Sequence, residues 1–268
     1  MKKILFPVII LSIVAACNDA EDVQLKPVPS DLAIEKLSGN IYLIEETPFQ
    51  TDSTGKIGEA DTCCVSIWDY DNSGYVKIYT QRAYTGGMRE ENFYERYENG
   101  LWKSSKTLKK KLPGGTFETM IDKKGNYKTA IEYDGAGKAI HYYNDLTQNE
   151  NGQVLTWKEF DKDSVFRTEG ANTFDSLFLR TSFTLKDSIG NVKSTATFKY
   201  NEKGELVEET KAETSQDTSS PIVTVTKYTY ETHDDHGNWT QRTTWNDKGK
   251  AIKIHQRIYN YNDPPTKQ

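Results

Sequence analysis

A short acidic segment carries oxygen side chains at the spacing that begins a calcium-binding loop. Counted from Asp69, the first, third and fifth positions are Asp69, Asp71 and Ser73, and Gly74 stands at the sixth. Alternating oxygen ligands before a glycine suit a hard cation such as Ca²⁺. The twelfth position is Thr80 instead of the glutamate that completes such a loop. We therefore expect a hairpin turn, and keep Asp69, Asp71 and Ser73 as candidate metal ligands.

A second candidate metal or acid–base cluster lies nearer the C-terminus. It consists of His233 and His236, with Asp234 and Asp235 between them. Imidazole and carboxylate groups bind transition metals, and histidine changes charge near neutral pH. Successive side chains of a strand point to opposite faces, so these four groups converge only in a special turn. We expect turn chemistry here, and keep His233 and His236 as candidate ligands.

The motifs of nucleophilic catalysis and of phosphate binding are missing from the sequence. It contains no Gly-x-Ser-x-Gly, no His-Glu-x-x-His and no Gly-x-x-x-x-Gly-Lys-Ser/Thr. We therefore predict no catalytic residues, no cofactor and no enzymatic activity. The alternative is an envelope hydrolase acting on glycans, with two carboxylates in a cleft of the sheet.

Composition narrows the class of protein. The 268 residues are 35% hydrophobic and 27% charged, yet 12% are aromatic, with 16 Tyr, 10 Phe and 5 Trp. That aromatic content argues against disorder over most of the length. A net charge of −5 gives no bulk electrostatic attraction to nucleic acid, so we expect no nucleic-acid partner.

The N-terminus has the order of a secretory signal. Lys2 and Lys3 precede an apolar run at residues 4–15, which is too short to span a bilayer. The four residues 14–17, Val-Ala-Ala-Cys, resemble the lipobox of bacterial lipoproteins. The resemblance implies that residues 1–16 are a signal peptide that is cut off, and that Cys17 carries acyl chains such as palmitate. Multiple chains anchor a protein stably, so the membrane is the expected partner.

The residues after Cys17 predict a tether. Residues 17–31 are acidic and contain prolines, so they cannot bury a core of their own. Loss of the two signal-peptide lysines takes the net charge from −5 to −7. The acidic cluster after Cys17 also resembles the export signal of surface lipoproteins in Bacteroidetes. We expect a lipid-anchored outer-membrane protein, facing either the periplasm or the cell surface.

Four Asp-Ser tripeptides, beginning at residues 52, 163, 175 and 187, have two interpretations. They resemble sites that Bacteroidetes O-glycosylate, and surface turns favour Asp-Ser equally.

The two remaining cysteines, Cys63 and Cys64, are adjacent. On a strand their thiols would point to opposite faces, giving one buried and one surface residue, and this is the arrangement we expect. A vicinal disulfide and intermolecular pairing are the alternatives, since the extracytoplasmic compartment permits disulfides.

Alternating polar and apolar residues predict antiparallel strands. Residues 221–230 alternate in this way, as do residues 238–245, where Trp239 and Trp245 would share one face. Polar residues followed by glycine separate the strands and favour hairpin turns at Gly125, Gly137, Gly204, Gly237 and Gly249. At most one short helix is expected, and residues 31–37 are the stretch with helical periodicity.

Some of these turns repeat at a fixed interval. Gly125-Asn-Tyr precedes Gly137-Lys-Ala-Ile by 12 residues, and Gly237-Asn-Trp precedes Gly249-Lys-Ala-Ile by the same 12. One strand and one tight turn account for that length. The segment Tyr-Thr-Tyr-Glu-Thr-His-Asp-Asp-His-Gly-Asn-Trp at residues 228–239 resembles the YD repeats of Rhs-type proteins. The resemblance is clearest over residues 115–262 and implies successive β-hairpins in one continuous sheet.

These observations combine into one prediction. We expect an all-β domain at residues 32–262, an antiparallel meander forming an open twisted sheet or a partly closed barrel, followed by a tail at residues 263–268. Repeated hairpins suit an extended surface better than one asymmetric cleft. The predicted function is therefore that of a non-enzymatic envelope lipoprotein that is structural or binds a glycan or another envelope protein.

Overall fold

A computed structural model describes residues 27–214 and 220–262. The expected signal peptide, the expected lipidation site Cys17 and the expected C-terminal tail all lie outside these described residues.

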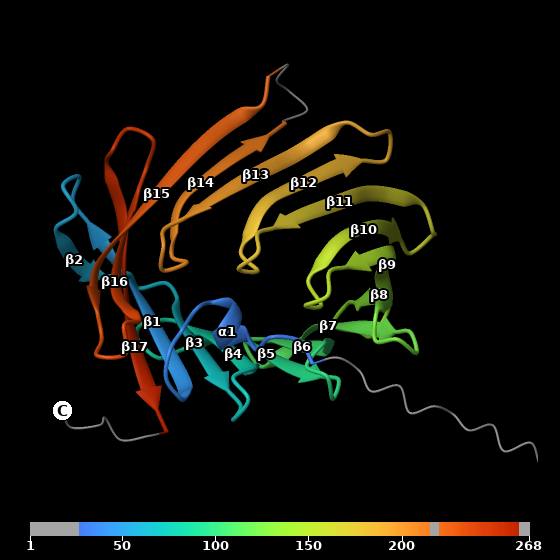
Figure 1. The fold of residues 1–268 in the computed structure, drawn as a ribbon, viewed down its shortest axis with the longest axis horizontal. Coiled ribbons are helices and arrows are strands. Elements are labelled where there is room, and N and C mark those ends of the chain that lie inside the picture. The colour runs from blue at the N-terminus through green and yellow to red at the C-terminus, as the bar shows by residue number, and fades with distance from the viewer. Residues whose placement is uncertain (1–26, 215–219, 263–268) are drawn as a thin grey trace, which may run out of the picture.

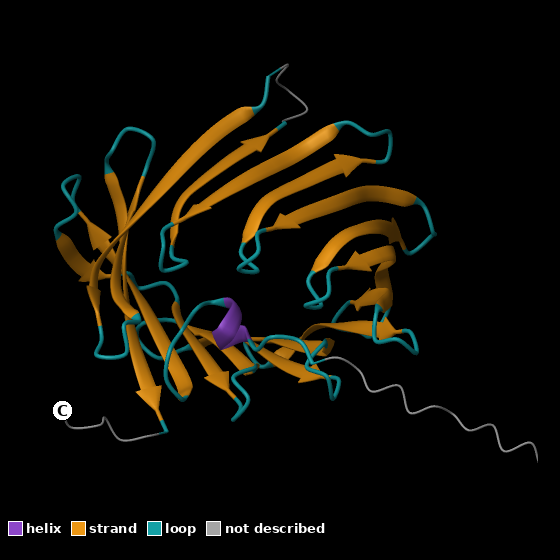
Figure 2. Cartoon of the chain, viewed as in Figure 1, coloured by secondary structure: helices purple, strands orange, loops and turns teal. Residues whose placement is uncertain are grey.

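The described chain is almost entirely strand (Figure 2). Its elements are α1 (Asp31–Ile34), β1 (Ile41–Thr51), β2 (Ile57–Ala60), β3 (Val65–Tyr70), β4 (Val76–Arg82), β5 (Met88–Arg96), β6 (Trp102–Lys109), β7 (Leu112–Ile121), β8 (Tyr127–Tyr133), β9 (Ala139–Gln148), β10 (Val154–Asp161), β11 (Phe166–Phe174), β12 (Arg180–Asp187), β13 (Val192–Tyr200), β14 (Leu206–Glu213), β15 (Ile222–His233), β16 (Trp239–Trp245) and β17 (Ala251–Tyr261). Among these elements there is no helix with the length and apolar character needed to cross a membrane.

The strands close into a barrel. From β3 to β17 each strand pairs antiparallel with the next along the chain, and β1 completes the ring by pairing with β17 and with β3. The short β2 pairs with the far end of β1, so 16 of the 17 strands form the ring seen in Figure 1. The all-β antiparallel meander is confirmed. The sheet closes completely because β1 bridges its two edges.

One hydrogen-bonding pattern builds the turns. In the turn after β7 the Gly125 amide donates to the carbonyl of Asp122, and Oδ1 of Asp122 accepts from the amides of Lys124 and Asn126. Gly125 has φ +80°, a conformation that costs glycine little. The same hydrogen bonds are headed by Asp71, Asp134, Asn149, Asp161, Asp175, Asp187, Asn201, Asp234 and Asn246. In the turns headed by Asp161 and Asp175, Ser164 and Phe178 take the place of the glycine and also have a positive φ. All five glycine turns expected from the sequence are confirmed.

Side chains alternate between the lumen and the outside of the barrel. Glu46 of β1 and Arg257 of β17 are register partners and point inward, where Arg257 reaches Glu35 beside α1. The preceding residue, Glu45, points outward and pairs with Arg82 at 2.9 Å. Each strand therefore contributes one row of side chains to the lumen and one to the outer wall.

The shared face expected for the two indoles of β16 is wrong. Trp239 lies in the lumen, where the guanidinium of Arg257 is 4.1 Å from its ring centroid. Trp245 lies on the outer wall and donates from Nε1 to the hydroxyl of Thr229. The pairing of β15 with β16 shifts register between Thr232 and His233, where Thr240 is an extra residue in β16, and this irregularity breaks the strict alternation.

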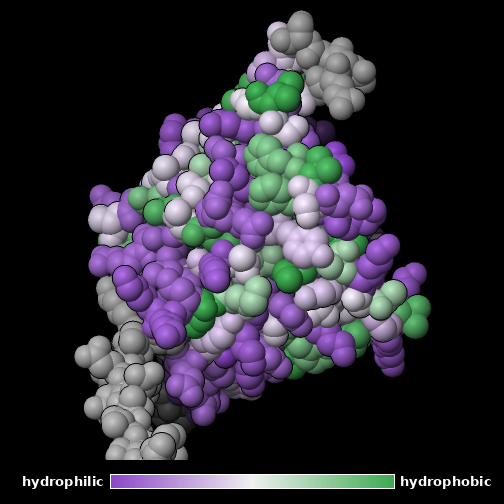
Figure 3. Space-filling view, turned by 90° about the vertical axis from the view of Figure 1, so that its right-hand side faces the viewer, coloured by the Kyte–Doolittle hydropathy of each residue, from purple (hydrophilic) through white to green (hydrophobic). Residues whose placement is uncertain are grey.

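The outer wall carries both charged and apolar side chains. Ion pairs cross it between neighbouring strands, with Lys199 and Glu208 at 2.7 Å and Lys158 and Asp145 at 2.8 Å. On the face shown in Figure 3, hydrophilic and hydrophobic residues are interspersed. Opposite charges on adjacent strands stabilise the pairing of those strands.

A small apolar core forms where the N-terminal segment meets the barrel. Leu32 of α1 packs with Ile41 and Ile44 of β1 and with Tyr70 of β3, and all four are buried. The predicted helix within residues 31–37 is confirmed as α1, which begins after Ser30. Figure 1 shows α1 inside the ring of strands.

Candidate binding site in the barrel lumen

The segment before β1 crosses one end of the barrel. Ser30 caps α1 by accepting a hydrogen bond from the Ala33 amide, as N-cap serines do. Oδ2 of Asp31 accepts from the Val76 amide at 2.7 Å and from Arg96 at 2.6 Å. These contacts attach α1 to β4 and β5.

Both flanks of α1 are also attached to turns at this end. The Val28 amide donates to the carbonyl of Asn99, in the turn between β5 and β6, and the Val28 carbonyl accepts from the hydroxyl of Tyr75. After α1, the amide and carbonyl of Ser38 both bond to the side chain of Asn238, each at 2.8 Å. Residues 28–38 therefore form a plug, held on both sides, that positions Glu35 in the lumen.

A buried charge cluster lies on the part of the lumen wall that contacts the plug. Nε of Arg257 donates to Oε2 of Glu46 at 2.7 Å, and Nδ1 of His255 lies 2.6 Å from Oε1. Arg242 approaches the same carboxylate at 3.8 Å. Burial by itself would raise the pKa of Glu46, but the His255 hydrogen bond and the charges of Arg257 and Arg242 outweigh it and lower the pKa to about 2. Glu46 is therefore a permanent anion of the wall.

Glu35 behaves differently. Its carboxylate lies 3.6 Å from Arg257, yet Arg257 is already engaged with Glu46. The Glu35 side chain is 42% exposed, but it lines two internal cavities, so that exposure faces the lumen. Desolvation by the surrounding wall raises the pKa of Glu35 above its ordinary value.

Aromatic side chains cover much of the inner wall. Tyr94, Trp102, Phe117 and Tyr143 follow one another on β5, β6, β7 and β9, with successive ring centroids 5.9, 5.3 and 5.5 Å apart. These distances are typical of favourable aromatic pairs.

The aromatic row continues on β10 and β12. The rings of Trp157 and Phe183 lie 6.2 Å apart across Gly170 of β11. A Cβ at Gly170 would overlap the indole of Trp157, so the glycine lets this ring lie flat on the sheet.

Three cavities of about 510, 490 and 250 Å³ adjoin in this lumen. Glu35 lines the first and third, Trp102 the second and third, and Val154 the first and second. An aromatic-lined space with a few charged groups is the usual form of a small-molecule site.

The candidate calcium ligands serve other roles. Asp69 lies on the outer wall, 3.0 Å from Lys77. Asp71 heads the turn after β3, where its Oδ1 accepts from the amides of Ser73 and Tyr75.

The candidate histidines are likewise separated in role. Nε2 of His233 lies 2.6 Å from Oε1 of Glu205, whereas the ring of His236 stacks on Tyr261 with centroids 4.0 Å apart. Across residues 27–214 and 220–262, no group of three or more His, Cys, Asp and Glu side chains is arranged to hold a metal ion.

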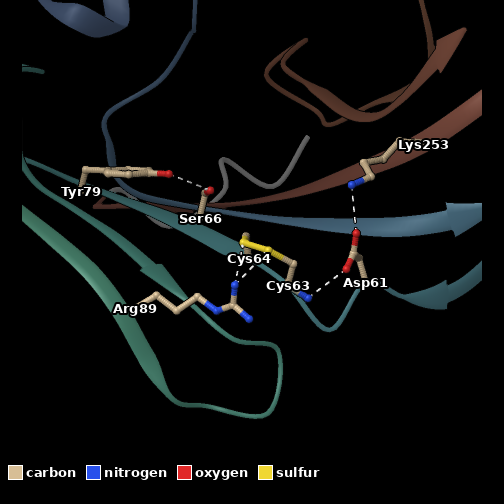
Figure 4. The surroundings of a disulfide bond; sticks show 7 residues. All are labelled: Asp61, Cys63, Cys64, Ser66, Tyr79, Arg89 and Lys253. Carbon is tan, nitrogen blue, oxygen red and sulfur yellow. Dashed lines mark hydrogen bonds and ion pairs between the residues drawn. A yellow bond between two sulfur atoms is a disulfide. The ribbon is translucent and has the colours of Figure 1, made fainter. Parts of the chain in front are cut away.

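The expected separation of Cys63 and Cys64 onto opposite faces of a strand is wrong. The two cysteines precede β3 in a loop and form a vicinal disulfide (Figure 4). The Cys63 amide donates to Asp61, and Arg89 of β5 donates to both sulfurs. The loop frees the pair from strand geometry, which is why the alternation argument failed.

The four Asp-Ser tripeptides all lie in turns with exposed serines. Asp175 and Asp187 head their turns, and the tripeptide at residue 163 sits within the turn headed by Asp161. The structure thus gives each of them a turn role.

The lumen residues were missed from the sequence. Arg257 is more than 200 positions from Glu35 and Glu46 in the sequence, and no local motif joins the three residues. The sequence signal that could have indicated them is the alternation of β17, together with the charged residues within that strand.

Comparison with known proteins supports the fold. The sequence matches no protein-family model and none of the curated proteins. The barrel resembles the crystal structure of a porin-like protein from Bacteroides uniformis, with a TM-score of 0.52 and 12% identity over 83% of this chain and 99% of that one. A porin-like protein from Bacteroides vulgatus has a TM-score of 0.39 and 11% identity, covering 82% and 98%. The TcdB2–TccC3 toxin complex matches at a TM-score of 0.29 and 12% identity, covering 82% of this chain and 14% of that one.

Proposed function

We propose that this protein is a lipid-anchored envelope protein that binds a small ligand inside its barrel without transforming it. The observation that carries the proposal is the series of adjoining, aromatic-lined cavities in the lumen. Their volumes are in the range of small-molecule sites. The porin-like protein of Bacteroides uniformis with the same fold supports an envelope location.

Membrane attachment is assigned to Cys17 and not to the wall. A barrel that spans a bilayer needs an apolar outer band. Here the outer wall carries inter-strand ion pairs such as Lys199 with Glu208. The lipobox-like residues 14–17 supply the alternative means of attachment.

The hydrolase alternative needs two carboxylates that share a substrate position. In the lumen, Glu132 and Glu159 are neighbouring carboxylates, because both approach Nδ1 of His141, at 3.2 and 3.7 Å. Each already accepts a hydrogen bond from the wall, Glu132 from Tyr143 and Glu159 from Thr168. These contacts favour a role in linking strands.

Lumen binding is tested with 1-anilinonaphthalene-8-sulfonate, an aromatic anion that fluoresces in apolar surroundings. The mature chain from residue 17, carrying Cys17→Ser so that it has no lipid, should enhance the dye's fluorescence. Trp157→Leu in the lumen should weaken dye binding several-fold. The matched control, Trp245→Leu on the outer wall, should leave it unchanged. Equal effects of the two variants, or no dye binding, would overturn the proposal.

The anchor is tested separately by fractionation. The wild-type chain should stay in the membrane pellet after washing with high salt, whereas Cys17→Ala should be released. A wild-type chain found in the soluble fraction would contradict the lipid anchor.

A further inference from the structure

We infer that the lumen takes an anionic amphiphile, a molecule with an acyl or similar apolar chain and one carboxylate or phosphate group. This inference rests on the proposed function and names the ligand class of the same site. It follows from two halves of the lumen that differ in chemistry and adjoin.

The first half is apolar. The cavity of about 490 Å³ is lined mainly by rings and aliphatic groups, including Phe117, Trp157, Phe183 and Leu185. Its few hydroxyl groups already have partners, since Thr119 donates to the carbonyl of Trp102. A sugar placed here would lose hydrogen bonds to water without replacement, whereas an acyl chain loses none.

Three further polar groups of this cavity are also engaged. The Tyr127 hydroxyl accepts from the Trp102 amide, and the Tyr143 hydroxyl donates to Glu132. Glu159 accepts from Thr168. The aromatic row is therefore suited to apolar chains more than to hydroxyl-rich rings.

The second half is cationic. The cavity of about 510 Å³ is lined by Arg180, Arg242 and Arg257. Arg257 is neutralised by Glu46. Arg180 has no carboxylate within 4 Å in the part of the chain that the structure describes, and its guanidinium rests on the rings of Phe183 and Phe198.

Arg242 adds a second open position. Its nearest carboxylate oxygen, on Glu46, is 3.8 Å away, and its buried Nε has no hydrogen-bond partner among the described residues. Buried polar atoms without partners carry a free-energy cost that a ligand can remove.

The charge balance of this half favours an anion. Of its two glutamates, Glu205 pairs with His233 at 2.6 Å. The other, Glu35, lies 3.6 Å from Arg257, so neither glutamate pairs with Arg180. Arginine binds carboxylate and phosphate in two-pronged geometry, so either group fits.

The two halves meet at shared residues. Val154 lines both cavities, and Phe183 lines the apolar one while lying 6.0 Å beneath the guanidinium of Arg180. A chain lying along the aromatic row would thus place its charged end beside Arg180.

The test compares three probes on the mature Cys17→Ser chain, using calorimetry below the micelle concentration. Oleate supplies chain and charge, oleyl alcohol supplies the chain alone, and maltohexaose represents a glycan. We expect oleate to bind at least tenfold more tightly than oleyl alcohol, with no binding of maltohexaose. Arg180→Gln should weaken oleate about tenfold and leave oleyl alcohol unchanged. Lys186→Gln, on the outer face of the same strand, is the matched control.

Three results would overturn the inference. One is oleate affinity that Arg180→Gln does not change, and another is equal affinity for oleate and oleyl alcohol. The third is binding of maltohexaose in place of oleate, which would make the lumen a glycan site. If 1-anilinonaphthalene-8-sulfonate still binds in any of these cases, the proposed function is retained and only the ligand class is wrong. If that dye also fails to bind, both the proposed function and the ligand class are wrong.

Discussion

Replacing Glu46 by glutamine tests the buried charge cluster directly. The substitution keeps the shape of the side chain but removes the anion that faces Arg257 and His255. The side chains of Glu46 and Arg257 are only 10% and 12% exposed, so solvent screens the loss weakly. Breaking a buried pair by removing one partner leaves an uncompensated charge, which typically costs about 3–5 kcal/mol.

The lowered pKa gives a second measure of the same quantity. A pKa reduced from 4.5 to about 2 corresponds to about 3 kcal/mol of stabilisation by the ionised form of Glu46. Because the folded-state pKa lies below the unfolded one, this stabilisation is complete above about pH 5. It is lost as the pH falls from there towards 2. The gap between wild type and Glu46→Gln should therefore be about 3 kcal/mol at pH 7 and narrow steadily on acidification.

Urea unfolding followed by tryptophan fluorescence measures this gap. Trp68 and Trp239 both lie against the guanidinium of Arg257, with ring centroids 5.4 and 4.1 Å away, and so report on the cluster. The control is Glu45→Gln, one residue earlier on the outer wall, whose partner Arg82 is 40% exposed. Its expected cost is below about 1 kcal/mol. A Glu46→Gln variant as stable as wild type at pH 7, or a gap that stays constant down to pH 3, would refute the reasoning.

Three further predictions concern backbone and disulfide. Gly237→Ala should lower the free energy of unfolding in urea by about 1 kcal/mol, because Gly237 has φ +83° and an added Cβ would meet no other atom. Its control is Gly87→Ala, which should leave stability unchanged because Gly87 also lies in open space but lacks a left-handed φ. Gly170→Ala should cost about 1–3 kcal/mol and alter the fluorescence spectrum, because the new Cβ displaces an indole; an unchanged spectrum and stability would contradict the stacking. Replacing Cys63 and Cys64 together by serine should cost only about 1 kcal/mol, since their bond closes a minimal loop, and in the unreduced protein mass spectrometry should find both cysteines protected from alkylation.

Much of the local structure could be predicted from the sequence because it depends on neighbouring residues. An aspartate or asparagine that bonds the amides two and four positions later, usually with glycine between them, defines most of the hairpin turns by itself. The 12-residue interval between Gly125 and Gly137 therefore predicts strands and turns correctly. The short helix at α1 followed from its own residues in the same way.

Tertiary structure decided everything that depends on which face of a strand points inward. Alternation defines two faces, and the register irregularity at Thr240 was enough to place Trp239 inside and Trp245 outside. The candidate metal ligands were chosen by proximity along the chain, but side chains that meet in a barrel come from different strands. His233 and His236 consequently found separate partners.

Closure of the barrel was likewise beyond local reasoning. It depends on β1 pairing with β17, contacts that place Glu46 opposite Arg257 across more than 200 residues. Only once the ring is closed does one face of the sheet become a lumen, with the plug across one end and Glu35 within it. Sequence patterns within each strand and its turn determine the order of strands and turns in the meander. The lumen site exists only because distant edges of the same sheet meet.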